Sequence, residues 1–113
     1  MFVSINNIPV AEGREADFEA LWRTRDRSVE QMPGFVSLDI LRPGLTVVMK
    51  PGEPPVKTDN TYQIMTRWES KDAFDAWLGS DSFRKAHSRE TDKTIFGGPG
   101  QVRLHETVDE AGA

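Results

Sequence analysis

Apolar residues recur along the chain with two spacings, and each spacing predicts one kind of element. Alternation with a period of two predicts strands at 2–8, 35–41, 61–68 and 101–108. A helical stripe predicts a first helix from residue 13 to 32, where Pro33-Gly34 ends it. The stripe consists of Phe18, Leu21, Trp22, Val29 and Met32. A second helix is predicted after Ser70 and a short third one after Ser80, because serine favours the N-cap position.

The order strand, helix, strand, strand, helix, strand is that of the split β-α-β unit. It predicts an α+β, ferredoxin-like fold with a four-stranded antiparallel sheet and both helices on one face. We expect a single domain over residues 1–108 and a frayed tail at 109–113. The long connection at 43–60 contains LTVVMK, either a short strand or part of a hairpin arm. Since no further element can cover the other sheet face, we expect a homodimer joined sheet to sheet, a dimeric α+β barrel.

Composition narrows the classes of partner. The chain has 113 residues, 37 % of them hydrophobic, and a formal net charge of −4, which suits one soluble globular domain. It has no cysteine, which excludes disulfides and thiolate metal sites. It has neither a lysine and arginine cluster nor the ~20-residue apolar run of a membrane span, so we expect no nucleic acid and no membrane as partner. The first residues lack the pattern of a secretory signal, and a cytoplasmic location is expected.

His87 is the sharpest candidate for chemistry. It lies one turn after Phe83, on the stripe expected to face the sheet. One interpretation is structural, because the end of a helix favours a cationic histidine. The other is that a neutral imidazole there binds a partner, and a metal ion is a common one.

Five further positions carry alternatives of the same kind. Trp22 and Trp77 lie on helix faces turned towards the sheet, where they either fill the core or form the wall of a pocket for a flat ligand. Arg25 lies on an apolar stripe, so it either reaches back to solvent or binds a ligand carboxylate. Asn6 and Asn7 point to opposite faces of the first strand, so at most one reaches a pocket on the helix side.

Several common site types have no motif in the sequence. It has no phosphate-binding loop, no paired-histidine metal motif, no haem-attachment motif and no nucleophile elbow. Residue spacing by itself therefore supports a ferredoxin-like dimer with a histidine-liganded pocket and leaves the ligand open.

The stretch WESKDAFDAWLGSDSFRKAH at 68–87 resembles the signature of the IsdG-type haem-degrading monooxygenases, within the antibiotic biosynthesis monooxygenase (ABM) superfamily. A Trp-x-Ser turn opens the second helix there, Ala-Phe-x-x-Trp follows, and a histidine comes shortly after an alanine. The similarity continues in Asn6, seven residues before Gly13, in Trp22 and Arg25, and in Pro-Gly-Phe at 33–35. It covers most of the chain except 43–60, which is longer than in those relatives.

The resemblance implies a role for each matching residue. His87 would be the axial ligand of the haem iron, Asn6 a hydrogen-bonding group on the distal side, and Trp77 the bulky wall that forces the porphyrin out of plane. A shift of one residue would give the distal role to Asn7. The other expected haem contacts lie on the two helices: Trp22, Arg25 and Phe83.

The activity that the resemblance implies is haem degradation. Haem serves as substrate and cofactor, O₂ and an external electron donor (a reductase or a small-molecule reductant) take part, and the ring opens to a bilin with release of iron. Two other functions stay open. One is a cofactor-independent ABM oxygenase acting on a quinol or similar aromatic, which needs no axial histidine. The other is a non-catalytic haem-binding dimer, which shares that histidine.

Overall fold

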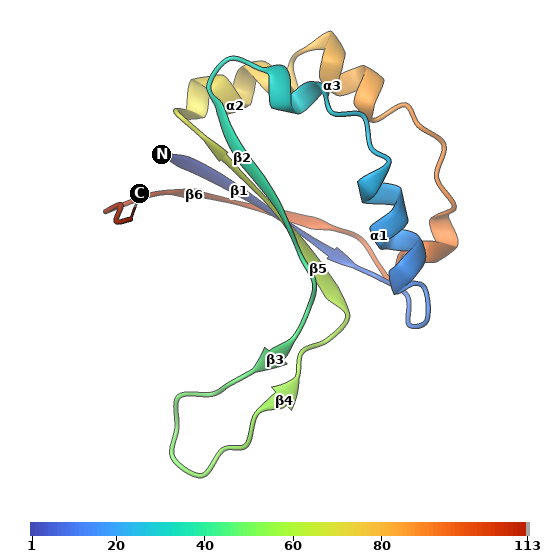
Figure 1. Ribbon diagram of the computed structural model, residues 1–113, viewed down its shortest axis with the longest axis vertical. Helices are drawn as coiled ribbons and strands as arrows, with labels where there is room; N and C mark the ends of the chain where they lie inside the picture. The colour runs from blue at the N-terminus through green and yellow to red at the C-terminus, as the bar shows by residue number, and fades with distance from the viewer. Residues whose placement is uncertain (113) are drawn as a thin grey trace.

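The computed structural model describes residues 1–112 and contains a four-stranded antiparallel sheet with helices on one face (Figure 1). The strands are β1 (Phe2–Pro9), β2 (Phe35–Leu41), β5 (Thr61–Trp68) and β6 (Gln101–Glu106), in the order β2-β5-β1-β6. The helices are α1 (Glu15–Arg23), α2 (Lys71–Leu78) and α3 (Asp81–Ala86), with 3-10 turns η1 (Ser28–Gln31) and η2 (Lys93–Ile95). The predicted α+β, ferredoxin-like arrangement is confirmed.

The first helix is shorter than predicted. α1 ends before Thr24 and η1 follows separately, so the prediction of one helix from 13 to 32 is wrong. Polar side chains here compete for the backbone groups that a helix needs. The Thr24 hydroxyl donates to the carbonyl of Ala20 at 2.9 Å, and the Asp26 carboxylate accepts from the backbone N–H of Ser28 at 2.8 Å. The break brings Val29 into a core cluster with residues of α2.

A bulge changes the faces of β2. The alternation predicts Val36, Leu38 and Ile40 on one face, but the register shifts between Phe35 and Ser37. As a result Phe35 and Leu38 both pack against the core, while Val36 is 41 % exposed. An extra residue in one strand has this effect because it reverses the alternation beyond it.

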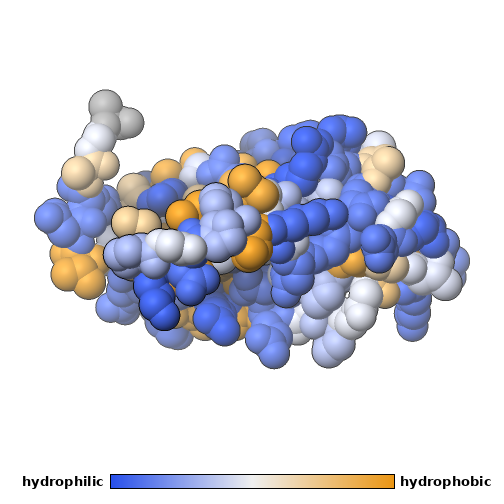
Figure 2. All heavy atoms as spheres, turned by 90° about the horizontal axis from the view of Figure 1, so that it is seen from below, coloured by the Kyte–Doolittle hydropathy of each residue, from blue (hydrophilic) through white to orange (hydrophobic). Residues whose placement is uncertain are grey.

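Residues 43–60 form a hairpin arm that projects from the sheet (Figure 1). β3 (Leu45–Thr46) pairs with β4 (Val56–Lys57), so the hairpin alternative for this segment is the one observed. Five large apolar side chains of the arm are exposed: Leu45, Val47, Val48, Met49 and Val56. Seen from below, the side of the molecule on which the arm lies, hydrophobic residues form separate spots among hydrophilic ones (Figure 2).

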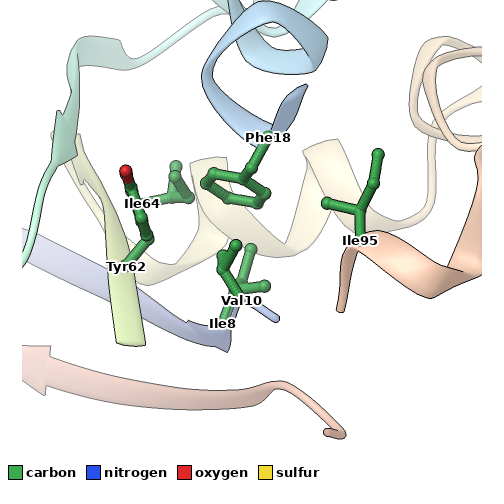
Figure 3. Packing of buried hydrophobic residues seen from close by; sticks show 6 residues of the cluster. All are labelled: Ile8, Val10, Phe18, Tyr62, Ile64 and Ile95. Carbon is green, nitrogen blue, oxygen red and sulfur yellow. The ribbon is translucent and has the colours of Figure 1, made fainter. Parts of the chain in front are cut away.

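Two clusters of buried side chains lie between the sheet and the helices. Phe18 points from α1 onto the first cluster, whose members are Ile8, Val10, Phe18, Tyr62, Ile64 and Ile95 (Figure 3). The second lies against α2 and consists of Phe2, Val29, Trp68, Phe74 and Trp77. Because Phe2 and Ile8 stand near opposite ends of β1, the middle of β1 belongs to neither cluster.

The two ends of the described chain lie together. β6 ends at Glu106, two residues earlier than predicted, and the backbone N–H of Thr107 donates to the carbonyl of Met1 at 2.9 Å. Glu110, within the tail expected to fray, lies 2.7 Å from the amino group of Met1. Residue 113 lies outside the described residues. Among residues 1–112, no helix has the length and apolar character needed to cross a membrane.

Candidate active site

A cavity of about 640 Å³ opens between the helices and the middle of the sheet. This volume lies within the range of pockets that hold small molecules and cofactors. Residues of α1, α2 and α3 form its walls, and residues of β1, β5 and β6 form its floor. The predicted site residues all line it: Asn6, Trp22, Arg25, Trp77, Phe83 and His87.

The floor of the cavity is polar at positions where the core pattern is apolar. Phe2 and Ile8 of β1 belong to the two core clusters, and between them Ser4 and Asn6 line the cavity. Thr66 of β5, the cross-strand partner of Ser4, lines it as well. The local patterns did not single out Ser4 and Thr66, although both interrupt apolar strand faces, which is the signal that could have revealed them.

Asn6, and not Asn7, faces the cavity. The Asn7 side chain lies on the opposite face of the sheet, where its Oδ1 accepts a hydrogen bond from Gln63 Nε2 at 2.9 Å. Gly100 lies against Asn6, and a Cβ at residue 100 would come within 3.4 Å of Asn6 Oδ1. Within residues 1–112 the Asn6 amide has no hydrogen-bond partner, so it is available to a ligand.

α3 places His87 at its C-terminal end beside the cavity. The Ser80 hydroxyl starts this helix by accepting from the backbone N–H of Phe83 at 3.0 Å. The exposed His87 ring stacks on Phe83 with centroids 4.0 Å apart, and its Nδ1 lies 2.8 Å from the carbonyl oxygen of Phe83. Because a carbonyl oxygen only accepts, Nδ1 carries the proton of the neutral ring and Nε2 keeps its lone pair. His87 can therefore ligate a metal through Nε2.

Two tryptophans give the cavity flat apolar walls. Trp77 is 8 % exposed and packs edge-to-face against Phe83 with centroids 5.4 Å apart. Its ring centroid lies 6.5 Å from that of His87. Trp22 is half-buried on α1, and its ring centroid lies 6.4 Å from that of Phe18. Both rings thus contribute to the core and to the cavity, so the alternatives stated for them are not exclusive.

Arg25 faces the cavity but already has partners. Its Nη1 donates to the carbonyl of Trp22 at 2.9 Å, and its Nη2 lies 3.2 Å from Glu30 Oε1. The side chain is 15 % exposed, and its buried Nε has no hydrogen-bond partner within residues 1–112. Arg25 is therefore not a free surface cation, and a ligand carboxylate would share it with Glu30.

Arg89 ties α1 to the segment after α3. Its Nη1 donates to the carbonyls of Leu21 and Thr24 at 3.3 and 3.1 Å, and its Nη2 donates to the Thr24 hydroxyl at 3.1 Å. A cation suits this place because the last carbonyls of a helix carry the negative end of its dipole. The contact holds the helix of Trp22 beside the segment that follows His87, and Arg89 itself lines the cavity.

A polar group anchors the other side of α1 to the sheet. The Tyr62 hydroxyl donates to Glu19 Oε2 at 2.6 Å, and Arg42 Nε donates to the same oxygen at 2.8 Å. The hydrogen bonds from Arg42, followed by that from Tyr62, lower the pKa of Glu19 to about 2. Glu19 is therefore ionised at neutral pH and fixes α1 behind the cavity.

The donor set of the cavity suits a metal that brings its own ligands. No group of three or more His, Asp or Glu side chains in residues 1–112 is arranged to hold a metal ion. The cavity instead offers one histidine nitrogen among aromatic walls. This combination fits a porphyrin, whose iron takes four ligands from the ring and an axial one from the protein.

Known proteins resemble this chain in sequence. The family model described as "Antibiotic biosynthesis monooxygenase" matches residues 1–89. The "Heme oxygenase (mycobilin-producing)" of Mycobacterium tuberculosis is 29 % identical over 110 residues, which cover 97 % of this chain and 92 % of that protein. A "Heme-degrading monooxygenase" of Bacillus cereus is 36 % identical over 62 residues, or 55 % of this chain and 49 % of that protein.

Solved structures extend the likeness to the fold. The structure of the heme-degrader MhuD from Mycobacterium tuberculosis, with two hemes bound in its active site, aligns with a TM-score of 0.74 and 29 % identity, covering 99 % of this chain and 100 % of that one. A variant of SnoaB, a cofactor-independent oxygenase from Streptomyces nogalater, aligns with a TM-score of 0.64 and 20 % identity, covering 96 % and 94 %. The second likeness shows the fold alone.

Proposed function

The chain belongs to the antibiotic biosynthesis monooxygenase family, and on this premise we propose that it is a haem-degrading monooxygenase. It binds haem as its substrate, opens the porphyrin ring with O₂ and reducing equivalents, forms a bilin and releases iron. The observation that carries the proposal is His87, whose Nδ1 is held by the Phe83 carbonyl. Its Nε2 has no hydrogen-bond partner within residues 1–112 and lies beside an aromatic-walled cavity. The names of the mycobacterial and Bacillus relatives support the same activity.

Residues on opposite sides of the cavity have different tasks in this proposal. His87 on the helical wall holds the haem iron through Nε2, and Trp22 and Phe83 contact the flat ring. Asn6 stands on the sheet floor, so its amide meets the ring face opposite His87 and donates a hydrogen bond there. The bound haem supplies the iron that activates O₂, and the protein supplies the orientation and the hydrogen bonds.

Trp77 acts on the bound ring through its size and rigidity. Its ring is buried and packs edge-to-face with Phe83, so it yields little to a ligand pressed against it. A porphyrin held by His87 would press against this rigid ring, and Trp77 would strain it towards the shape needed for ring opening. Arg25 takes a haem propionate while staying bonded to Glu30.

A homodimer is the second part of the proposal. The accessible surface is 7925 Å², whereas a compact monomer of 12.7 kDa exposes about 6,200 Å². The radius of gyration is 15.9 Å, against about 13 Å for a compact 113-residue domain. The excess surface exceeds the roughly 800 Å² that each partner buries in an ordinary interface.

We further propose that an external reductase or a small-molecule reductant supplies the electrons, and that the protein is located in the cytoplasm.

Two other functions make different demands on the same cavity. A cofactor-independent oxygenase such as SnoaB shares the fold but needs no metal-ligating nitrogen, so the orientation of His87 weighs against it. A haem carrier needs the same nitrogen and differs only in leaving the ring intact.

The deciding experiment is haem titration of the purified apoprotein followed by ascorbate in air. We expect a histidine-ligated Soret band that decays as bilin absorption appears. Binding without decay, with ascorbate or with a reductase, would show a carrier. Absence of binding would remove the proposal and favour the quinol oxygenase.

A further inference from the structure

Ser4 is a buried polar residue with no partner in the protein. It is 7 % exposed and lines the cavity floor, and its hydroxyl makes no hydrogen bond to any of residues 1–112. The buried side-chain atoms without a hydrogen-bond partner in residues 1–112 are Arg25 Nε and Ser28 Oγ, so the Ser4 oxygen itself is open to the cavity. A hydroxyl group in this position takes its partner from the cavity.

Thr66 supplies a second group at the same place. It is the cross-strand partner of Ser4, and its hydroxyl oxygen accepts from Trp68 Nε1 at 3.0 Å. An indole nitrogen only donates, so the hydroxyl hydrogen of Thr66 remains free to donate towards the cavity. Side chains directly opposite on antiparallel strands have Cβ atoms about 4.5–5.5 Å apart, and two hydrogen bonds of about 2.8 Å span such a gap.

We infer that Ser4 and Thr66 form a binding site for one ordered water molecule on the cavity floor, beside Asn6. The chain of donors has a fixed direction, from the Trp68 indole to Thr66 and then to the water. Asn6 is two residues from Ser4 on the same strand face, about 6.6 Å away along β1. The water therefore extends the polar strip begun by the Asn6 amide.

This water has a use if the cavity holds haem, a step that rests on the proposed function. Ser4, Thr66 and Asn6 lie on the floor, opposite the wall that carries His87. The water then donates a hydrogen bond on the ring face opposite His87. All the groups that orient it are neutral near pH 7, so they position a donor without supplying a proton.

Crystal structures of the haem-free protein test the water site itself. Wild type and Ser37→Ala, a serine of β2 outside the cavity, should show water density within about 2.6–3.2 Å of both hydroxyls. In Ser4→Ala the water should be absent or displaced. Thr66→Val should have the same effect, although valine keeps the shape of the threonine side chain. A well-resolved wild-type structure without water at this place would overturn the inference.

Visible titration of the ferric haem complex tests the role towards haem. Removing a donor from the distal face should raise the pKa of the iron-bound water by about 0.5–1 unit in Ser4→Ala, the size of one hydrogen bond, with haem affinity within twofold of wild type. Ser37→Ala should match wild type. An unchanged pKa in both Ser4→Ala and Thr66→Val would overturn this role. A wild type that binds no haem would instead refute the proposed function, and the crystal structures would still decide the water site.

Discussion

Phe83 orients His87 twice: its carbonyl oxygen lies 2.8 Å from His87 Nδ1, and its ring stacks on the imidazole with centroids 4.0 Å apart. A hydrogen bond to one ring nitrogen fixes the tautomer and makes the other a better ligand. The same residue thus sets the direction and the tautomer of the candidate ligand before any metal arrives.

Replacing His87 should abolish axial ligation. We expect His87→Ala to lose the histidine-ligated Soret spectrum and more than about 100-fold in haem affinity, because even outer-sphere partners of metal ligands contribute 10–100-fold. His105→Ala is the matched control, because His105 lies on β6 outside the cavity. Haem titration measures both. A His87→Ala protein with the parent spectrum and affinity would make His87 structural.

Shortening Trp77 should separate binding from turnover. In Trp77→Ala the anchor at His87 remains, so haem should stay bound, while bilin formation should fall because a flatter ring moves the meso carbon away from the reacting oxygen. Trp77→Phe should lie between the two. The substitution should reduce stabilisation of the transition state and leave haem binding unchanged. Its effect should therefore appear in the rate of Soret decay with ascorbate, not in the haem dissociation constant.

The Trp77 test needs a folding control. Trp77 is also part of a core cluster, so its removal is expected to cost about 3–5 kcal/mol of unfolding free energy. Each variant must first show wild-type circular dichroism and mass in solution. Equal decay rates in wild type and folded Trp77→Ala would rule out the distortion role.

The excess surface predicts a dimer at micromolar concentration. Ile5 lies on the sheet face away from the helices, and Ile5→Asp should give monomers because it places a charge in the expected interface. Ala76→Asp, on the exposed side of α2, should stay dimeric. Light scattering measures the mass, and a monomeric wild type would contradict the prediction.

The lowered pKa of Glu19 predicts part of the loss of folding stability in acid. Hydrogen bonds from Arg42 and then Tyr62 lower its pKa from 4.5 to about 2 in the folded protein. Because the folded pKa lies below the unfolded one, its stabilisation is complete above about pH 4.5 and is lost as the pH falls towards 2. Glu19→Gln should therefore be less stable at neutral pH and less sensitive to pH in this window.

Denaturant unfolding at several pH values between 5 and 2 measures this dependence. Glu53→Gln, on the exposed arm, is the control and should follow wild type. The same slope in Glu19→Gln and in wild type would show that Glu19 does not anchor α1 electrostatically.

Local sequence patterns predicted the elements that depend on apolar periodicity. The alternation of Tyr62, Ile64 and Trp68 predicted β5, and the spacing from Phe83 placed His87 on the cavity side at the C-terminal end of α3. The end of α1 was missed because Thr24, whose hydroxyl bonds back to the helix, does not alter the apolar stripe.

The polar floor was missed for a different reason. Ser4 and Thr66 each interrupt an apolar strand face, but only the register between β1 and β5 makes them neighbours. Register is a long-range property that a local pattern does not contain. Asn6 and Asn7 could not be separated for the same reason, until the structure placed Gln63 beside Asn7.

The cavity also divides the hydrophobic interior, and this has a consequence for local opening. The cluster of Phe18 and the cluster of Trp77 lie on either side of it, and the half-buried Leu38 packs against both. Two weakly joined units can open separately, so amide protons of α1 and of α2 should exchange at different rates in the empty protein. A flat ligand that touches both units ties them together, which should slow exchange in both helices and raise the melting temperature with ligand concentration. Ligand binding thus completes the fold of the helical layer.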